Sequence, residues 1–498
     1  MNEPAVSSVY NAQLRTPSAR RFKRYYPTDA NFGAGFSIRE SQAVADGLYN
    51  ETTFGAAAVN VLTRDVIGTG LRLEPSPEEI GPVTQKRRVQ WISTMSALWR
   101  LWADSRDADY YGKDTFNSLQ QQAYREIKVH GDVLVHLVLV KGNNGLPALK
   151  VQLISGRMVA NDGGQMMDTK QETAGVLLDA QGRETGFRVR ETDDNRIDTF
   201  HGKVCQKFDS TGRQVYALVH IGDPYPNMVR GVSVFNAIKD HVLNTIRFDD
   251  AYAGKAIAQS IFAVGFKHSQ EVSRTALENI AEASGSGEGE EEEQLDLSQT
   301  GATFDMAPGE EAQVIENNTP GASYKDYMEE RNKLSAMAVG IPIERLTSSY
   351  NANYSASRAA IQDAERYNRM DREEFATKFC QFVYEAFCDI CVADGYVKAP
   401  GYFDDPLYRK AYRQATWTGP VATDIDPVKE VKAKVIAINN RLTTRERAAK
   451  DLYGMDFTEV IGKQAQEESV ALAHGVSLPE TDVTGTQDST DENDEGEE

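Results

Sequence analysis

The feature that most constrains the fold is an uncharged polar segment set between two long helical patterns, within residues 323–395. The first pattern begins with Ser323 and Asp326 at the spacing of a capping box. It continues with apolar side chains at steps of three and four residues. Gly340 and Pro342 then predict its end, because glycine tolerates the left-handed helix terminus and proline cannot continue a helix. A helix is therefore predicted over 323–340.

The segment that follows carries hydroxyl and amide groups and no charge. Its members are Thr347, Ser348, Ser349, Tyr350, Asn351, Ala352, Asn353, Tyr354 and Ser355. Beyond it, apolar residues recur in helical phase as far as Gly395. They are Ala360, Ala364, Tyr367, Met370, Phe375, Phe379, Phe382, Phe387 and Ile390. By local pattern alone, the two helices and the segment between them form an ordinary helical hairpin.

The first half of the chain mixes helical and strand patterns. Apolar periodicity predicts helices from residue 37 to about 62, over 84–103 and over 115–129. Short apolar runs between Gly-, Asn- and Asp-rich turns predict strands over 133–140, 151–154, 175–178 and 187–190. Gly68 and Gly70 lack the third glycine and the helix placement of a nucleotide-binding fingerprint, so no cofactor is expected there.

A further long helix is predicted over 233–261, with Ser233 as its cap. An insertion of roughly 60 residues separates it from the helix at 323–340, and holds an acidic run. The acids of that run are Glu288, Glu290, Glu291, Glu292 and Glu293. Near the C-terminus, helices are predicted over 426–438, from 444 to about 453 and over 457–473, and the acidic tail from about residue 476 has the composition of a disordered segment.

The net charge of −20 is concentrated in two segments. Residues 480–498 hold nine acids and no base, and residues 285–296 hold six acids and no base, which leaves −5 for the rest of the chain. A basic, Tyr-containing arm, in which acids are absent between Pro4 and Thr28, opens the sequence. The arm is usually solvated in such chains, or it touches nucleic acid or a neighbouring subunit.

The sequence offers little catalytic chemistry. Cys388 and Cys391 lie late in an apolar helix, away from the helix start where a redox pair has a lowered pKa, so buried structural thiols are expected. No metal or cofactor is expected, because the histidines are scattered and Walker and zinc-protease motifs are absent. No apolar run approaches the roughly 20 residues of a membrane span. Adjacent acids at 193–194 and 249–250 keep a metal-dependent nuclease open as a remote alternative.

Several motifs, in order, resemble the lambda-type portal proteins of tailed bacteriophages. The similar stretches are residues 334–346 with Tyr350 and 355–360, the Gly68-Thr-Gly70 signature preceded by Ile67 where the family has valine, 99–103 with Phe116, Leu119 and 131–132, 219–221 with 229–232, and Trp417 before 419–420. The resemblance covers roughly residues 10–467. The acidic run and the acidic tail depart from the family.

The resemblance implies an α+β fold assembled as a ring around a central channel. Its parts would be a basic arm (1–35), an α/β wing (36–232), a stem helix (233–261), a clip (262–322), a second stem helix (323–340), a tunnel loop (341–356), a long wing helix with its connector (357–420), a helical crown (421–475) and a disordered acidic tail (476–498).

The resemblance also implies a function in the virion, at one capsid vertex, after assembly in the host cytoplasm. Twelve copies would surround duplex DNA during packaging and ejection, with residues 347–355 facing it. The acidic run Glu288 to Glu293 is the expected docking surface for partners. Implied partners are the large terminase subunit, capsid and scaffold proteins, and neck or head–tail adaptor proteins; no enzyme activity is expected. The alternative within structural proteins is a head–tail adaptor or neck ring.

Overall fold

A computed structural model describes most of the chain between residues 34 and 475. The described residues are 34–140, 144–161, 169, 171–193, 196–223, 225–261, 265–268, 310–313, 321–348, 354–420, 427–454 and 457–475. The arm predicted for residues 1–35 lies outside them except for its last two residues, and the acidic run and the tail lie wholly outside.

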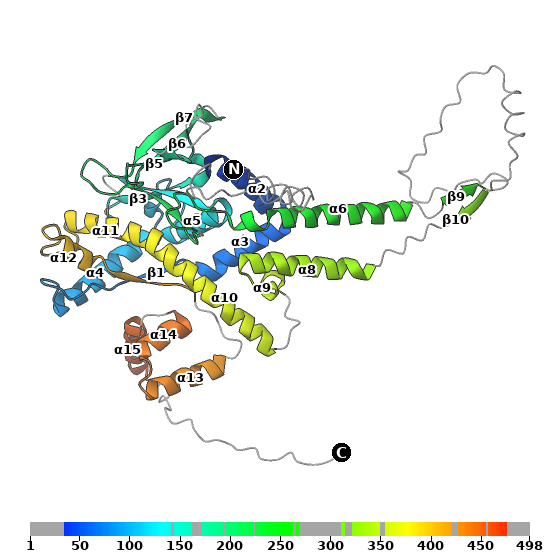
Figure 1. Cartoon of the computed structure of the whole chain (residues 1–498). Helices are drawn as coiled ribbons and strands as arrows, with labels where there is room; N and C mark the ends of the chain where they lie inside the picture. The colour runs from blue at the N-terminus through cyan, green and yellow to red at the C-terminus, as the bar shows by residue number, and fades with distance from the viewer. Residues whose placement is uncertain are drawn as a thin grey trace, which may run out of the picture.

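Four helices from the first third of the chain build one side of the body (Figure 1). They are α2 (Ala34–Glu51), α3 (Thr53–Val66), α4 (Gln85–Ala103) and α5 (Phe116–His130). The continuous helical pattern predicted from residue 37 is broken at Thr52, whose Oγ1 accepts the Gly55 N–H at 3.0 Å and caps α3. A Cβ on Gly55 would lie 2.1 Å from the Leu48 carbonyl oxygen, so the glycine allows the two helices to meet closely.

The body contains two antiparallel sheets. In the first, β2 (Asp132–Leu139) lies between β3 (Leu149–Ser155) and β8 (Tyr216–His220), with Val133 opposite Ser155 and Val135 opposite Ala217. The second runs in chain order through β4 (Glu172–Thr173), β5 (Val176–Leu178), β6 (Glu184–Asp193) and β7 (Arg196–Gln206). Apolar runs predicted four of these strands. The sequence analysis did not predict β4, β7 or β8, and the residues of β7 are mostly polar.

A third pairing joins distant parts of the chain. β1 (Arg72–Pro75) pairs antiparallel with β11 (Ala415–Thr418), so that Leu73 lies opposite Trp417. Thr418 Oγ1 donates to Glu74 Oε1 at 2.8 Å across the pair. The body is therefore built from both halves of the sequence. The short helix α12 (Pro406–Tyr412) precedes β11.

An aromatic cluster forms the centre of the core. The Trp99 ring lies 5.1 Å from Phe116, 5.0 Å from Phe387 and 5.7 Å from Trp417, centroid to centroid. Edge-to-face packing of this kind stabilises beyond the burial of apolar area. The cluster fixes α4, α5 and β11 against the long C-terminal helix. 

That long helix has three parts: α10 (Tyr354–Phe375), a π-helical turn η5 (Ala376–Cys380) and α11 (Gln381–Ala393). Phe375, Phe379 and Phe387 are buried, as the apolar phase predicted. Tyr367 and Met370 share the apolar phase of the helix but are 62% and 69% exposed. The N-terminal half of α10 extends beyond the core (Figure 1), and the π turn changes the phase of side chains across it.

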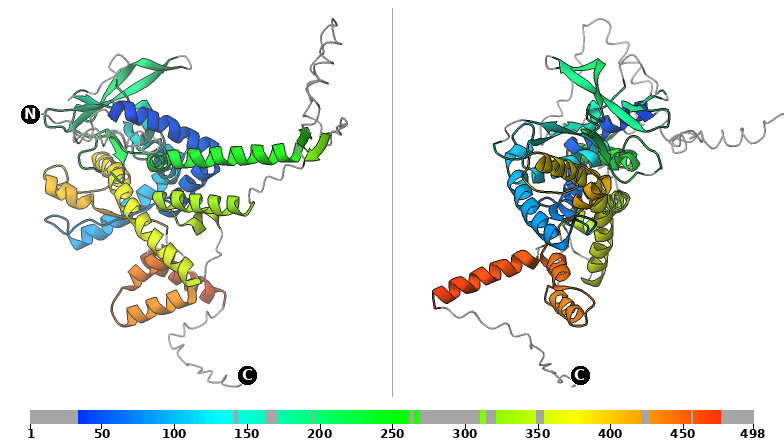
Figure 2. Two further views of the ribbon diagram at one scale, coloured as in Figure 1. Left: turned by 45° about the vertical axis from the view of Figure 1, so that its right-hand side comes forward. Right: turned by 90° about the vertical axis from the view of Figure 1, so that its left-hand side faces the viewer.

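Two helices project from the body side by side (Figures 1 and 2). They are α6 (Lys239–Ile261) and α8 (Gly321–Val339), and β9 (Gly265–His268) pairs with β10 (Glu310–Gln313) beyond the end of α6. Both predicted starts are wrong. Ser233 caps a short 3₁₀ turn, η4 (Val234–Ala237), before α6 begins, and Ser323 lies inside the first turn of α8 rather than at its N-cap. At 1.5 Å per residue, α6 is about 35 Å long.

Three helices near the C-terminus form a separate group below the body in Figure 1. They are α13 (Pro427–Asn439), α14 (Arg445–Tyr453) and α15 (Phe457–Ala473), which lie within a residue of the ranges predicted. Thr444 Oγ1 accepts the Arg447 N–H at 3.1 Å, as its position at the start of α14 predicted.

Candidate functional site

The projecting helices are joined near the body by a reciprocal polar contact. Arg331 Nη1 on α8 donates to His241 Nδ1 on α6 at 2.7 Å. His241 Nε2 donates to the Arg331 carbonyl oxygen at 3.2 Å, and Arg331 Nε donates to the Tyr327 hydroxyl at 2.9 Å. These bonds require the neutral imidazole tautomer that carries its proton on Nε2.

Farther from the body, two pairs of aromatic rings, one tilted and one stacked, hold the two helices together. The Phe248 and Tyr327 ring centroids are 4.2 Å apart, and so are those of Tyr252 and Tyr324. The Tyr324 hydroxyl also donates to Asp249. Because each ring pair joins α6 to α8, the two ring pairs fix the register of one helix relative to the other.

At the body end of α8, the chain turns sharply towards the predicted polar segment. Gly340 adopts a φ of +79°, and the Ile341 N–H donates to the Ala336 carbonyl at 3.0 Å, which closes the helix with a left-handed residue as predicted. Pro342 then starts a single helical turn, α9 (Ile343–Thr347). Ser348 ends it with a φ of +53°.

The segment without regular structure between α9 and α10 is shorter than the loop predicted over 341–356. Thr347 is the last residue of α9, where its Oγ1 donates to the Ile343 carbonyl at 2.9 Å, and Tyr354 and Ser355 open α10. The prediction of continuous loop is therefore wrong at both ends. Ser349, Tyr350, Asn351, Ala352 and Asn353 lie outside the described residues.

Two arginines outside the polar segment contact the C-terminus of α3: Arg345 lies two residues before the segment and Arg372 seventeen residues after it. Arg345 of α9 pairs with Asp65 at 3.1 Å. Arg372 of α10 donates through Nη2 to the Asp65 carbonyl at 2.9 Å and through Nε to the Val66 carbonyl at 3.0 Å. Its Nη1 donates to Glu365 at 3.1 Å. The Arg372 guanidinium satisfies carbonyls that a helix C-terminus leaves without partners, and both arginines favour its partial negative charge.

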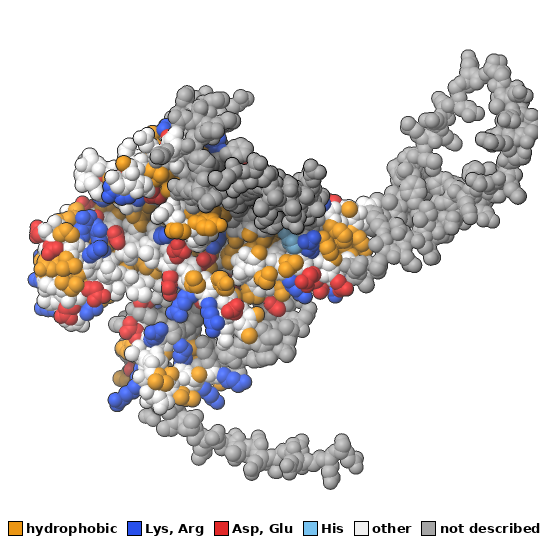
Figure 3. Space-filling view, viewed as in Figure 1, with side chains coloured by type: hydrophobic (Ala, Val, Ile, Leu, Met, Phe, Trp, Pro, Cys, Tyr) orange, Lys and Arg blue, Asp and Glu red, His pale blue; other side chains and the backbone are white. Residues whose placement is uncertain are grey.

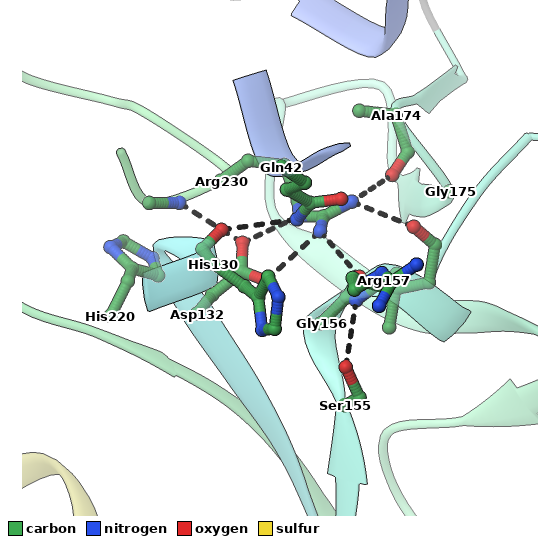
Figure 4. Close-up of polar contacts among 12 residues, drawn as sticks. Gln42, His130, Asp132, Ser155, Gly156, Arg157, Ala174, Gly175, His220 and Arg230 are labelled. Carbon is green, nitrogen blue, oxygen red and sulfur yellow. Dashed lines mark hydrogen bonds and ion pairs between the residues drawn. The ribbon is translucent and has the colours of Figure 1, made fainter. Parts of the chain in front are cut away.

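A buried ion pair fixes the strand-to-helix connection that leads to α6 (Figure 4). Arg230 is 2% exposed and Asp132 is fully buried. Arg230 Nε and Nη2 donate to the two Asp132 carboxylate oxygens at 2.6 and 2.9 Å. The remaining guanidinium N–H groups donate to three backbone carbonyls, those of Gly156 (2.8 Å), Val159 (2.9 Å) and Ala174 (2.6 Å).

Every donor of Arg230 is thus used, so the buried charge is fully compensated. The Gly231 N–H also donates to Asp132, at 3.1 Å. A Cβ on Gly231 would lie 2.0 Å from the Gly131 carbonyl oxygen, which only glycine avoids. Sequence reasoning missed the pair; the signal was a lone arginine between Val229 and Val232.

A histidine next to this pair links three elements. His130 Nδ1 lies 2.9 Å from Glu126, and its Nε2 lies 3.0 Å from Asp46 of α2. Ser155 Oγ donates to the same Glu126 carboxylate at 2.5 Å. Burial acts to lower the pKa of His130, but the hydrogen bonds and charges of Glu126 and Asp46 outweigh burial and raise it.

The cysteines and adjacent acids considered above for redox or metal chemistry do not form such a site among the described residues. Cys380, Cys388 and Cys391 are buried, as predicted for the last two, and burial raises the pKa of each thiol. Asp249 accepts the Tyr324 hydroxyl, and Asp194 lies outside the described residues. Among the residues the structure describes, no three His, Cys, Asp or Glu side chains are grouped to hold a metal ion, and no helix is both long and apolar enough to cross a membrane.

Comparison with known families settles the kinship of the chain. The sequence profile described as "Phage portal protein, lambda family" matches residues 20–372. The chain belongs to the lambda family of phage portal proteins. The match includes the projecting helices and the polar segment.

Individual portal proteins are similar over most of their length. The portal protein of Escherichia phage N15 is 21% identical over 462 residues, covering 88% of this chain and 85% of its own. Portal protein B of Escherichia phage lambda is 21% identical over 468 residues, covering 89% and 86%. A solved structure, the neck of a native gene transfer agent particle, matches with a TM-score of 0.45 and 11% identity, covering 82% of this chain and 92% of its own.

Proposed function

We propose that this portal protein forms a ring, of twelve copies, at one vertex of the capsid, and that duplex DNA passes through its bore during packaging and ejection. Residues 36–232 and 357–420 form the wing, α6 and α8 form the stem, the β9–β10 hairpin belongs to the clip, and α13–α15 form the crown. The ring assembles in the host cytoplasm and stays in the virion.

The observation that carries this proposal is the pair of projecting helices. Among the described residues, the two helices lie side by side and apart from the body over most of their length (Figure 2). Apolar side chains remain exposed on them, with Leu243 and Phe248 each 37% exposed, Leu334 41% and Met337 72%. Such surfaces are covered when copies stand side by side around an axis.

The polar segment suits a surface that DNA slides past. Each Lys or Arg that pairs with a phosphate adds salt-dependent affinity, and several together add orders of magnitude. Residues 347–355 carry no charge. Arg345 and Arg358 flank the segment in the sequence, and Arg345 is paired with Asp65 of α3, so its charge is not offered to a phosphate. A ring of these segments would touch the duplex without gripping it.

The test replaces Ser349 and Asn351 with arginine. Every copy then adds two cations to the same bore, and packaging or exit of DNA should slow at low salt and recover partly as salt rises. The matched control carries alanine at both positions and should package normally. Unchanged packaging by the arginine variant would remove the role proposed for the segment.

Electron microscopy of the purified protein tests the ring itself. Negatively stained particles should be rings with a bore wide enough for duplex DNA. A monomer, or a closed assembly without a bore, contradicts the proposal.

The acidic run of the clip is proposed as the docking surface for the packaging motor and later for neck proteins. Replacing Glu288 and Glu290–Glu293 with glutamine should weaken co-sedimentation with the large terminase subunit. The same assay separates a portal from a head–tail adaptor ring, because an adaptor would not bind terminase. Capsid and scaffold proteins are the partners proposed for the wing and crown. No catalytic role is proposed, and the energy for packaging comes from a separate ATPase.

A further inference from the structure

Among the residues that the structure describes, little of helix α15 is covered by its own chain. Every residue from Ile461 to Val470 is exposed, and Leu472 is 84% exposed. The helix runs away from α13, α14 and the body in the right-hand view of Figure 2. Most helical stability in proteins comes from the packing of a helix face, so the exposed surface of α15 is suited to a contact with another chain.

One face of α15 combines apolar and acidic side chains. Ile461, Glu468 and Leu472 are spaced by seven and four residues, which places them along a single stripe. The helix as a whole has three acids and one base between residues 457 and 473, a net charge of −2.

A complementary stripe lies on α13. Val428, Lys432 and Val435 are spaced by four and three residues, and all three are exposed, with Val428 at 63% and Val435 at 45%. Residues 427–453 hold seven bases and three acids, a net charge of +4. Figure 3 shows Lys and Arg side chains around apolar ones on this part of the surface.

We infer that α15 of one copy packs across α13 of the neighbouring copy, with Glu468 against Lys432 and with Ile461 and Leu472 covering Val428 and Val435. This inference rests on the ring proposed above and deepens it. Each chain carries one stripe of each kind, and a contact between two different surfaces repeats from copy to copy until a ring closes. The charges and the apolar side chains of both stripes are then matched at once.

Two other occupants fit the α13 stripe less well. The acidic tail at 476–498 would supply charge but has few apolar residues, and DNA would supply charge alone. The valines of the stripe favour a partner that is both acidic and apolar, as α15 is.

Cross-linking tests the contact. All four native cysteines are buried, so cysteines introduced as Val435→Cys and Leu472→Cys are the sites that a short bis-maleimide reaches. The double variant should give a ladder of covalent multimers on a denaturing gel. Each single variant should give no ladder. Val435→Cys combined with Gln466→Cys, on the opposite side of α15, is the matched control and should cross-link several-fold less.

A charge swap gives a second measurement. Glu468→Lys or Lys432→Glu alone should lower the ladder yield about two- to fivefold per interface, and the two together should restore it. A wild-type protein that forms no ring overturns the proposed function. Rings without the cross-link, a cross-link lost on deletion of residues 476–498, or a Lys432→Glu variant that loses only DNA binding would each overturn this inference.

Discussion

Arg230 shows how one buried side chain positions a whole helix. It joins β2, through Asp132, to three carbonyls in the turns around β3 and β4, and it lies nine residues before α6 begins. The direction in which α6 leaves the body therefore depends on the buried ion pair of Arg230 with Asp132.

Removing one partner should be costly. Arg230→Met leaves the Asp132 carboxylate buried without its counter-ion, and such losses cost about 3–5 kcal/mol. We expect the urea midpoint, followed by tryptophan fluorescence of the body core, to fall accordingly. Arg183→Met removes an exposed pair with Asp179 and should lower the urea midpoint far less. Equal effects of the two variants would contradict the role given to Arg230.

His130 makes the packing of α2 on α5 sensitive to pH. Its pKa is raised above 6.5 in the folded protein, so the folded state holds the proton more tightly than the unfolded state. That stabilisation is complete below pH 6.5 and is lost as the pH rises through the folded-state pKa. The unfolding free energy of wild type should exceed that of His130→Gln most at pH 6, and the difference should shrink towards pH 9. A difference that grows with pH would contradict this.

At the scale of elements, apolar periodicity and capping residues predicted the helices well where local signals decide. α4, α5 and α13–α15 begin and end within a residue or so of the predicted positions, with Thr115 and Thr444 at the caps. The errors arise where distant contacts decide. Ser233 has the chemistry of an N-cap, yet the bonds of Arg230 hold the chain in a 3₁₀ turn there and delay α6.

The candidate site was predictable only in composition. The uncharged run was evident in the sequence. The contacts of Arg345 and Arg372 with the end of α3 were not, because they join residues about 280 to 307 positions apart. No local pattern contains that information. The exposure of Tyr367 has the same origin, because the end of the core, not the periodicity of α10, determines it.

The contact of α10 with the end of α3 can be tested on the helix itself. Arg372→Met removes three hydrogen bonds between α10, its own Glu365 and the end of α3. Limited proteolysis within α10 should then become several-fold faster. Arg366→Met, on the same helix with its side chain 82% exposed, should leave the rate unchanged. Equal rates in both variants would show that Arg372 does not hold α10 in place.

At the scale of the molecule, the projecting helices and the insertion between them extend from a body that has its own hydrophobic core. The core includes Val242 of α6 and Val339 of α8, at the ends of these helices nearest the body. The aromatic pairs farther from the body join α6 to α8. The stem is therefore an independent source of stability rather than a support for the body.

Replacing residues 247–333 with a flexible Gly/Ser linker should leave the body folded. We expect a cooperative thermal transition within a few degrees of that of the full chain, because the aromatic core is untouched. The shortened chain should be monomeric by light scattering at concentrations where the full chain forms rings. Loss of the cooperative transition would show that the stem supports the body.

The pairing of β1 with β11 has a consequence for synthesis. Glu74 and Thr418, which bond across that pair, are 344 residues apart. A nascent chain leaving the ribosome therefore exposes Trp99 and its neighbours until almost the whole message has been translated. Portal subunits of this kind should complete their folding after release from the ribosome, with the help of chaperones, rather than during translation.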